Sequence, residues 1–190
     1  MDLAVIVALL SVLGGGSVLL AVEGLGRLRR LYEQGGEQHW ARLGAAVGLL
    51  HGHGDQGEHI LEGQREGVWL NVTADGVWMV VRGRIDAPMP AGLEIRRRRR
   101  LSARHRLHTG NPLLDSTLDI AGSQPAAALL QDPELVAPIM GVVHAWPDAA
   151  IDERYVVLRY PDALGRELDG RCQEVIDAVL ALRAASRRLL

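Results

Sequence analysis

The hydropathy pattern begins with a long apolar segment. Leu3 to Val22 form twenty consecutive positions without a charged side chain. Twenty helical residues span about 30 Å, the thickness of the hydrocarbon core of a bilayer, where only a helix satisfies its own backbone. We therefore expect residues 1–23 to form a transmembrane anchor. A cleaved signal peptide and a buried helix of a soluble protein remain alternatives, although Met1-Asp2 lacks the basic charge of a signal peptide.

Arginines next to this segment predict its orientation. Arg27, Arg29, Arg30 and Arg42 follow it, and no basic residue precedes it. Basic residues that flank a membrane helix are enriched on the cytoplasmic side. We expect a single-pass protein of the bacterial inner membrane with its C-terminal domain in the cytoplasm. The single cysteine, Cys172, fits a reducing compartment.

A helical and loop-like region is expected over residues 24–57. Leu25, Leu28 and Leu31 recur every three residues, which favours a juxtamembrane helical stalk. Trp40 to Leu50 is a short apolar segment that favours a second helix, too short to span a membrane. A glycine- and histidine-rich stretch follows, which we expect to be a flexible loop.

A β-hairpin is the strongest local signal beyond that loop. Residues 68–74 alternate between apolar and polar side chains, and Asp75-Gly76 is a typical two-residue hairpin turn. A turn at this position predicts that Thr73 pairs with Trp78. The same register sets Leu70 opposite Val81 and Trp69 opposite Arg82 on the other face, where a cation–π contact is expected.

The remaining pattern changes from strands to helices. Further strands are expected at 93–97, 115–121 and 155–160, and Asp132-Pro133-Glu134 has the composition of a helix start. A final helix carries an apolar stripe at Leu168, Cys172, Val175, Val179 and Leu182. The expected fold class is therefore α+β: an N-terminal transmembrane helix followed by one domain, residues 58–190, with an antiparallel sheet and packed C-terminal helices.

Composition narrows the classes of protein that fit this pattern. The chain has 190 residues, 48% of them hydrophobic, and a net charge of −2. These values exclude a disordered chain, and one cysteine excludes a multi-cysteine zinc module. All 21 basic residues are arginine and phenylalanine is missing. Because lysine and phenylalanine need AT-rich codons, this bias points to a GC-rich bacterial genome.

Charge is segregated along the chain. Residues 51–108 hold ten arginines and seven acids, whereas residues 109–190 hold seven arginines and twelve acids. The basic excess comes from a run that we treat as a low-priority candidate for binding an acidic protein or anionic lipid: Arg96, Arg97, Arg98, Arg99, Arg100, Arg104 and Arg106. A charged strand edge, or a match to the acidic half of the same chain, is the favoured explanation of the run, and nucleic acid is the least favoured partner because few aromatic residues accompany it.

Candidate cofactor chemistry is confined to the glycine- and histidine-rich loop. Its Gly52–Gly57 stretch matches G-x-G-x-x-G, but no helical stripe follows, so we expect no nucleotide cofactor. His51, His53 and His59 are weak candidates for a transition-metal site. Since the spacing lacks a helical ligand pair, we expect solvated loop histidines, no metal and no cofactor.

One short motif resembles a known family. Thr109-Gly110-Asn111-Pro112-Leu113-Leu114-Asp115 resembles the Thr-Gly-Asp-Pro-x-Phe-Asp signature of uncharacterised bacterial membrane-anchored proteins, with Asn111 and Leu114 as departures. The resemblance covers roughly residues 58–188. It implies a strand, a helix that ends in paired leucines, a second helix and a terminal helix, and it implies no known reaction or ligand.

The expected function is binding rather than catalysis. The sequence contains no nucleophile elbow, P-loop lysine or helical zinc-protease motif. We expect a membrane-anchored, non-catalytic interaction or scaffold module that contacts lipid through Leu3 to Val22. Two alternatives stay open: a metal-dependent or otherwise unassigned membrane-tethered enzyme, and an accessory subunit of a membrane complex.

Overall fold

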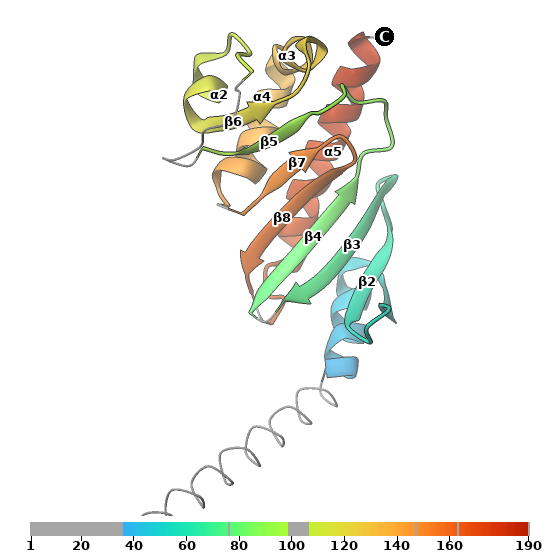
Figure 1. The fold of residues 1–190 in the computed structure, drawn as a ribbon. Helices are drawn as coiled ribbons and strands as arrows, with labels where there is room; N and C mark the ends of the chain where they lie inside the picture. Colours follow the sequence, from blue (N-terminus) through green and yellow to red (C-terminus); the bar gives the residue numbers. More distant parts are fainter. Residues whose placement is uncertain (1–35, 76, 99–106, 147, 163, 190) are drawn as a thin grey trace, which may run out of the picture. The chain divides into compact units, whose positions relative to one another are not determined.

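A computed structural model describes residues 36–75, 77–98, 107–146, 148–162 and 164–189 (Figure 1). The chain forms two compact units, Met1–His39 and Trp40–Leu190. In the first unit the described residues, 36–39, are helical. The second unit contains the helical residues 40–47 and all of the described strands. The candidate sites described below lie in this second unit.

An eight-stranded antiparallel sheet forms the second unit, with the strand order β1-β2-β3-β4-β8-β7-β5-β6. Its strands are β1 (Leu50–His53), β2 (His59–Arg65), β3 (Val68–Asp75), β4 (Trp78–Arg84), β5 (Glu94–Arg97), β6 (Leu118–Ala121), β7 (Ala150–Asp152) and β8 (Tyr155–Pro161). All strand pairs in this sheet are antiparallel, and the described helices and strands follow one another without a regular β-α-β alternation, which confirms the expected α+β class.

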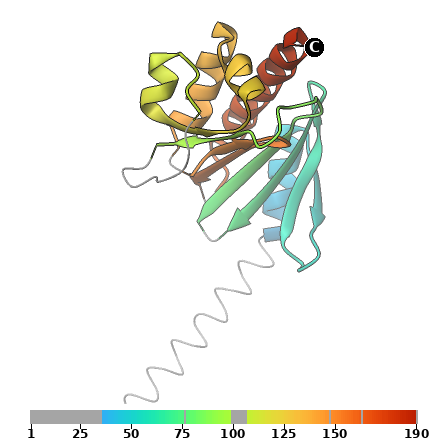
Figure 2. The ribbon, with the colours of Figure 1, turned by 45° about the horizontal axis from the view of Figure 1, so that its top comes forward.

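The helices gather on one side of the sheet (Figure 2). They are α2 (Pro112–Thr117), α3 (Gln124–Leu130), α4 (Pro133–Ile139), a π-helical turn η1 (Met140–His144) and α5 (Leu168–Leu189). The described helix α5 packs against β3, β4 and β8. Its predicted apolar stripe is buried, and Cys172 is a fully buried member of the core. Asp132 caps α4 by accepting a hydrogen bond from the Glu134 amide, as its sequence predicts.

The hairpin between β3 and β4 forms with a register different from the predicted one. Thr73 pairs with Val80, and Asp75 pairs with Trp78. The pairing is therefore shifted by two residues from the register that a turn at Asp75-Gly76 requires. Because side chains alternate along a strand, a shift of two keeps every apolar residue on its predicted face. The predicted partner of Trp69 was wrong: the guanidinium over its ring belongs to Arg84, at 5.6 Å from the ring centroid.

Two other local predictions need correction. The strand expected at 115–121 begins only at Leu118, because Pro112–Thr117 forms the short helix α2. Asn111 caps this helix, and Pro112 occupies its first turn, a sequence that favours a helix start over a strand. The glycine- and histidine-rich stretch is not a continuous loop, since Leu50–His53 forms the edge strand β1.

The apolar segment Leu3 to Val22 lies outside the described residues, so its prediction as a membrane anchor stays a prediction. Within the described ranges, no single helix is long and apolar enough to cross a bilayer. Among the described helices, the pair formed by Gln124–Leu130 and Pro133–His144 passes that test together, and the two members are bent by 88°.

Candidate functional site

The β1–β2 hairpin brings three histidines onto one face of the sheet. His53 pairs directly with His59, and His51 lies two residues before His53 on the same strand. Directly paired residues share a face, and so do residues at positions i and i+2. Gly54 to Glu58 form the connecting turn, in which Gly57 adopts a positive φ of 80° that favours glycine. The two-residue spacing of His51 and His53 would separate metal ligands on a helix. On a strand, the same spacing brings the histidines together.

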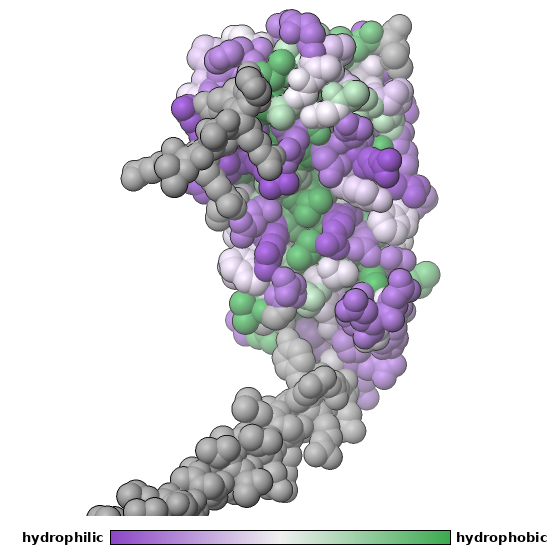
Figure 3. Space-filling model, viewed as in Figure 1, coloured by the Kyte–Doolittle hydropathy of each residue, from purple (hydrophilic) through white to green (hydrophobic). Residues whose placement is uncertain are grey.

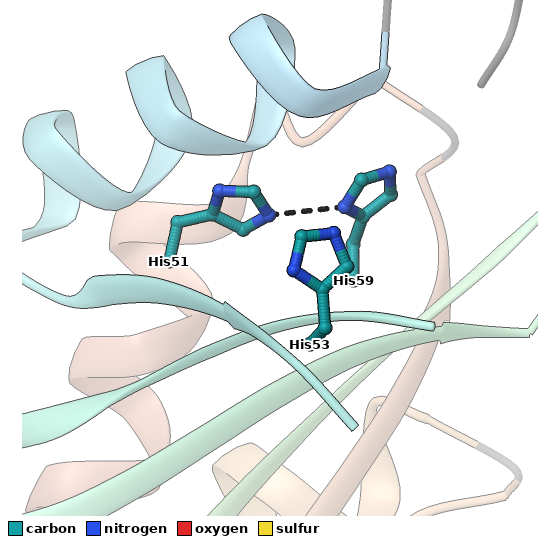
Figure 4. A group of neighbouring side chains, drawn as sticks. All are labelled: His51, His53 and His59. Atoms are coloured by element: carbon teal, nitrogen blue, oxygen red, sulfur yellow. Dashed lines mark hydrogen bonds between the residues drawn. The ribbon is translucent and has the colours of Figure 1, made fainter. Parts of the chain in front are cut away.

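The three imidazoles converge on one small space, which we call the histidine cluster (Figure 4). Potential ligand nitrogens of the three rings all lie within 4.8 Å of one another. His51 Nε2 and His59 Nδ1 are hydrogen-bonded at 3.0 Å. One of these two nitrogens donates its proton to the lone pair of the other, so a metal ion that binds both nitrogens would replace this hydrogen bond. The cluster therefore has the donor atoms and the proximity that a transition-metal ion requires.

The helical stretch over 40–47 covers the side of the hairpin that carries these histidines. Trp40 stacks on His59 with 5.8 Å between ring centroids and an interplanar angle of 22°. Leu61, opposite His51 in the register, is fully buried and packs close to Gly44 of the same helix. His53 stays exposed, whereas His51 and His59 are half-buried. The cluster is thus supported from one side and open to solvent at His53.

An acidic turn lies next to the histidine cluster. The Glu58 carboxylate accepts a hydrogen bond from the Gln56 amide at 3.0 Å. A Cβ atom at Gly54 would meet this carboxylate, so the Glu58 side chain lies close to Gly54. Asp55 lies in the same turn. Two carboxylates beside the three imidazoles place negative charge at this end of the hairpin, which favours cations.

The opposite face of the same hairpin is hollowed. An open pocket of about 590 Å³ is lined by residues of β1, the turn, β2 and Trp69 of β3. Leu50, Ile60 and Glu62 alternate with the histidines along their strands, which places them on the other face. Gly52 and Gly54 also line the pocket and contribute no side chain to fill it. His51 and His53 of the histidine cluster line the same pocket, so the pocket and the cluster adjoin at the edge strand β1.

The sheet face opposite α5 carries a hydrogen-bonded ladder of polar side chains. Arg82 Nη1 donates to Asn71 Oδ1 and to Thr73 Oγ1, each at 3.2 Å. Asn71 Nδ2 donates in turn to Glu62 Oε1 at 2.8 Å. The alternation in residues 68–74 predicted this face, but its cross-strand partners depend on the register, which the sequence analysis misplaced by two residues.

Two half-buried tryptophans flank this ladder. The Arg84 guanidinium lies over Trp69, and the Arg159 guanidinium lies over Trp78 at 5.2 Å from the ring centroid. Arg159 also forms an ion pair with Asp75 at 2.8 Å. In Figure 3, hydrophobic surface lies between hydrophilic side chains on this side of the sheet. We call the ladder and its two tryptophans the open sheet face.

The arginine run is described only at its start. Arg96 forms an ion pair with Glu94 at 2.5 Å, and Arg98 Nη1 donates to the Ser116 carbonyl at 3.3 Å. Arg97 pairs with Leu118 across β5 and β6. The other members of the run, Arg99, Arg100, Arg104 and Arg106, lie outside the described residues. Two of the described arginines are thus engaged with their own domain.

The Thr109–Asp115 motif forms a closed turn before α2. Asp115 Oδ1 accepts from both the amide and the hydroxyl of Thr109 at 2.9 Å, and Oδ2 accepts from the Gly110 amide at 3.2 Å. Partial burial alone would raise the pKa of Asp115, but these hydrogen bonds outweigh it and lower the pKa below its usual value. The motif therefore has a structural explanation, and its family resemblance stays a prediction.

Comparison with known proteins identifies a shared fold. No family model and no curated protein matches the chain. A solved structure, the mycobacterial trehalose monomycolate transport factor A, is similar with a TM-score of 0.52 and 13% sequence identity. The similarity covers 81% of this chain and 95% of that chain. At this identity the likeness is one of fold.

Proposed function

We propose that this protein is a membrane-anchored, non-catalytic interaction module that serves as an accessory factor of a bacterial envelope transporter. The open sheet face carries the proposal. Its polar side chains are hydrogen-bonded to one another across β2, β3 and β4, and its half-buried tryptophans leave apolar surface for a partner. An enzyme instead requires polar groups that converge on a bound substrate.

The proposed occupant of the open sheet face is the cytoplasmic part of an integral membrane transporter. The apolar segment Leu3 to Val22 would hold the domain at the membrane, with the arginines after it on the cytoplasmic side. The fold is shared with a protein described as a transport factor. Interface cores are enriched in tryptophan and arginine. The open sheet face carries both residue types, at Trp69, Trp78, Arg84 and Arg159.

The arginine run is a less favoured contact surface in this proposal. Arg96 and Arg98 are engaged with Glu94 and the Ser116 carbonyl, so part of their charge is already compensated. The remaining positive charge of the run would lie close to the membrane and would attract anionic lipid or an acidic protein. We assign the run a supporting role and the open sheet face the specific one.

Site-specific photo-crosslinking of the full chain in bacterial membranes tests this proposal. A benzophenone amino acid replaces Trp78 on the open sheet face, and a matched chain carries it at Leu180, which is exposed on α5. We expect position 78, but not position 180, to crosslink to a polytopic membrane protein. Equal crosslinking from both positions, or crosslinking to lipid alone, would contradict the proposed interface.

Two further experiments separate the parts of the proposal. Replacing Arg96 to Arg100 by serine should leave the position-78 crosslink in place, whereas its loss would move the interface to the arginine run. A C-terminal reporter that is active only outside the cytoplasm should stay inactive in the full chain. Activity of that reporter would overturn the orientation without affecting the choice of interface.

A further inference from the structure

We propose that His51, His53 and His59 form a binding site for one divalent transition-metal ion, with zinc as the best match. This site goes beyond the proposed interaction function and lies on the opposite face of the β1–β2 hairpin from the open sheet face. The inference rests on four observations: the donor set, the spacing of the nitrogens, the support of the rings and the charge around them.

The donor set favours zinc and its neighbours in the transition series. Neutral imidazole binds zinc, copper and nickel well, whereas magnesium and calcium prefer oxygen ligands. Three histidines with a fourth position left for water form a known arrangement for zinc. Here the three come from two paired strands, so the pairing of His53 with His59 fixes their relative positions before any metal binds.

The spacing is close to what one ion needs. Two nitrogens on a tetrahedral zinc ion lie about 3.4 Å apart, since each Zn–N bond is about 2.0–2.1 Å long. His51 Nε2 and His59 Nδ1 already lie 3.0 Å apart, and all three rings offer nitrogens within 4.8 Å. Small side-chain rotations therefore suffice to close the site around an ion.

The ring protons of the histidines are also compatible with metal binding. In the hydrogen-bonded pair, one ring donates the proton that lies between His51 and His59. When both nitrogens bind a metal, the donor ring remains neutral by carrying its proton on its other nitrogen. A ring that is protonated before binding releases one proton to solvent. The site therefore needs no oxidant, reductant or further reactant.

Neighbouring groups hold the rings and compensate an added positive charge. Trp40 stacks on His59 and restricts the orientation of that ring. Glu58 and Asp55 place carboxylates in the adjoining turn. Since His53 is exposed, an ion can reach the cluster from solvent without any rearrangement of the fold. A bound ion would link the edge strand β1 to β2.

Zinc titration of the tag-free full chain in detergent, after removal of metals with a chelator, tests the site. We expect one zinc ion per chain by calorimetry, and a tetrahedral visible spectrum when cobalt is used instead. Single substitutions H51A, H53A and H59A should each weaken zinc binding by at least ~100-fold, because outer-shell partners alone cost 10–100-fold. H144A, at an exposed histidine of η1, should leave the affinity unchanged.

A conservative variant distinguishes ligation from loss of structure. His53 is exposed, so H53A should retain the far-ultraviolet circular dichroism of the metal-free protein. H53C supplies another zinc ligand at the same position and should restore one-to-one binding, with a new sulfur-to-cobalt absorption band. Absence of one-to-one binding, or affinities equal in H144A and the three cluster variants, would overturn the proposal. Neither result would affect the crosslinking from position 78, so the two proposals fail separately.

Discussion

Gly83 of β4 lies in direct contact with Val175 of α5. A Cβ atom at residue 83 would lie 2.5 Å from Val175 Cγ1 and 3.0 Å from Val179 Cγ2. No side chain fits between the strand and the helix at this point without displacing one of them. The close approach of α5 to the middle of the sheet therefore depends on a hydrogen atom in place of a side chain.

G83A should destabilise the protein, because an extra methyl group in a packed core forces its neighbours out of position. Overpacking of this kind costs about 1–3 kcal/mol of unfolding free energy. Urea denaturation followed by circular dichroism measures the change. G141A is the matched control, since a Cβ atom at Gly141 meets no atom within 4 Å. A loss of stability no larger in G83A than in G141A would contradict the described packing of α5.

D115N should weaken the turn before α2, because the neutral amide of asparagine accepts hydrogen bonds from Thr109 and Gly110 less strongly than a carboxylate. Hydrogen bonds to a charged group contribute about 1.5–3 kcal/mol each, so we expect a loss of roughly 1–3 kcal/mol at pH 7. The matched control is D55N, which changes an exposed carboxylate in the β1–β2 turn.

The stability difference between wild type and D115N should depend on pH. The pKa of Asp115 is lowered from 3.8 in the folded protein, so the unfolded chain binds a proton more readily as the pH falls. The stabilising contribution is therefore complete well above pH 3.8 and is lost as the pH falls through the folded pKa. Urea denaturation from pH 7 to pH 3 should show the gap between wild type and D115N narrowing. A gap that is constant or widens with acidification would contradict the hydrogen-bonded turn.

R171K should be costly although it keeps the positive charge. The Arg171 guanidinium lies over Trp146 at 4.5 Å from the ring centroid and forms ion pairs with both Glu167 and Glu174. An ammonium group cannot stack in this way while it also bridges two carboxylates. We expect a loss of about 1–2 kcal/mol, measured by thermal and urea denaturation. R187K, at an exposed position in the last turn of α5, should change stability by less than about 0.5 kcal/mol.

Cys172 should resist thiol reagents in the folded protein. Burial raises the pKa of this thiol to about 11, so little thiolate forms near neutral pH, and the side chain is fully buried. Mass spectrometry after treatment with a maleimide at pH 7.5 should show no adduct until the protein is unfolded in guanidinium chloride. In an L180C variant, whose new thiol lies on the same helix at a position 37% exposed, one adduct should form without denaturant. Rapid labelling of Cys172 in the folded wild type would show that the core around α5 opens.

Strong local patterns allowed much of the sheet and of α5 to be predicted from the sequence. The alternation over 68–74 identified both faces of β3, and the stripe from Leu168 to Leu182 identified the buried side of α5. The hairpin register was wrong by two residues, because alternation specifies the face of each residue and not its partner. The partner depends on the position of the turn. The Asp75-Gly76 signal predicts one position, and the observed pairing of Asp75 with Trp78 does not fit it.

The histidine cluster shows why site prediction is harder than fold prediction. His51 and His53 are two residues apart, which separates ligands on a helix but aligns them on a strand. The segment lacks the β-branched residues that identify strands, and Leu50–His53 becomes a strand by pairing with β2. Its secondary structure is thus set by tertiary contacts. The position of His59 opposite His53 follows from that pairing and has no signal of its own in the sequence.

The place of β1 in the sheet has a mechanical consequence. Following the chain from residue 40, the first strand reached is β1, at one edge of the sheet and paired only with β2 among the described strands. If the N-terminal segment is held in a membrane while the domain is pulled by a partner, the load reaches this four-residue strand before any other. A metal ion held by β1 and β2 would raise the force at which that hairpin yields.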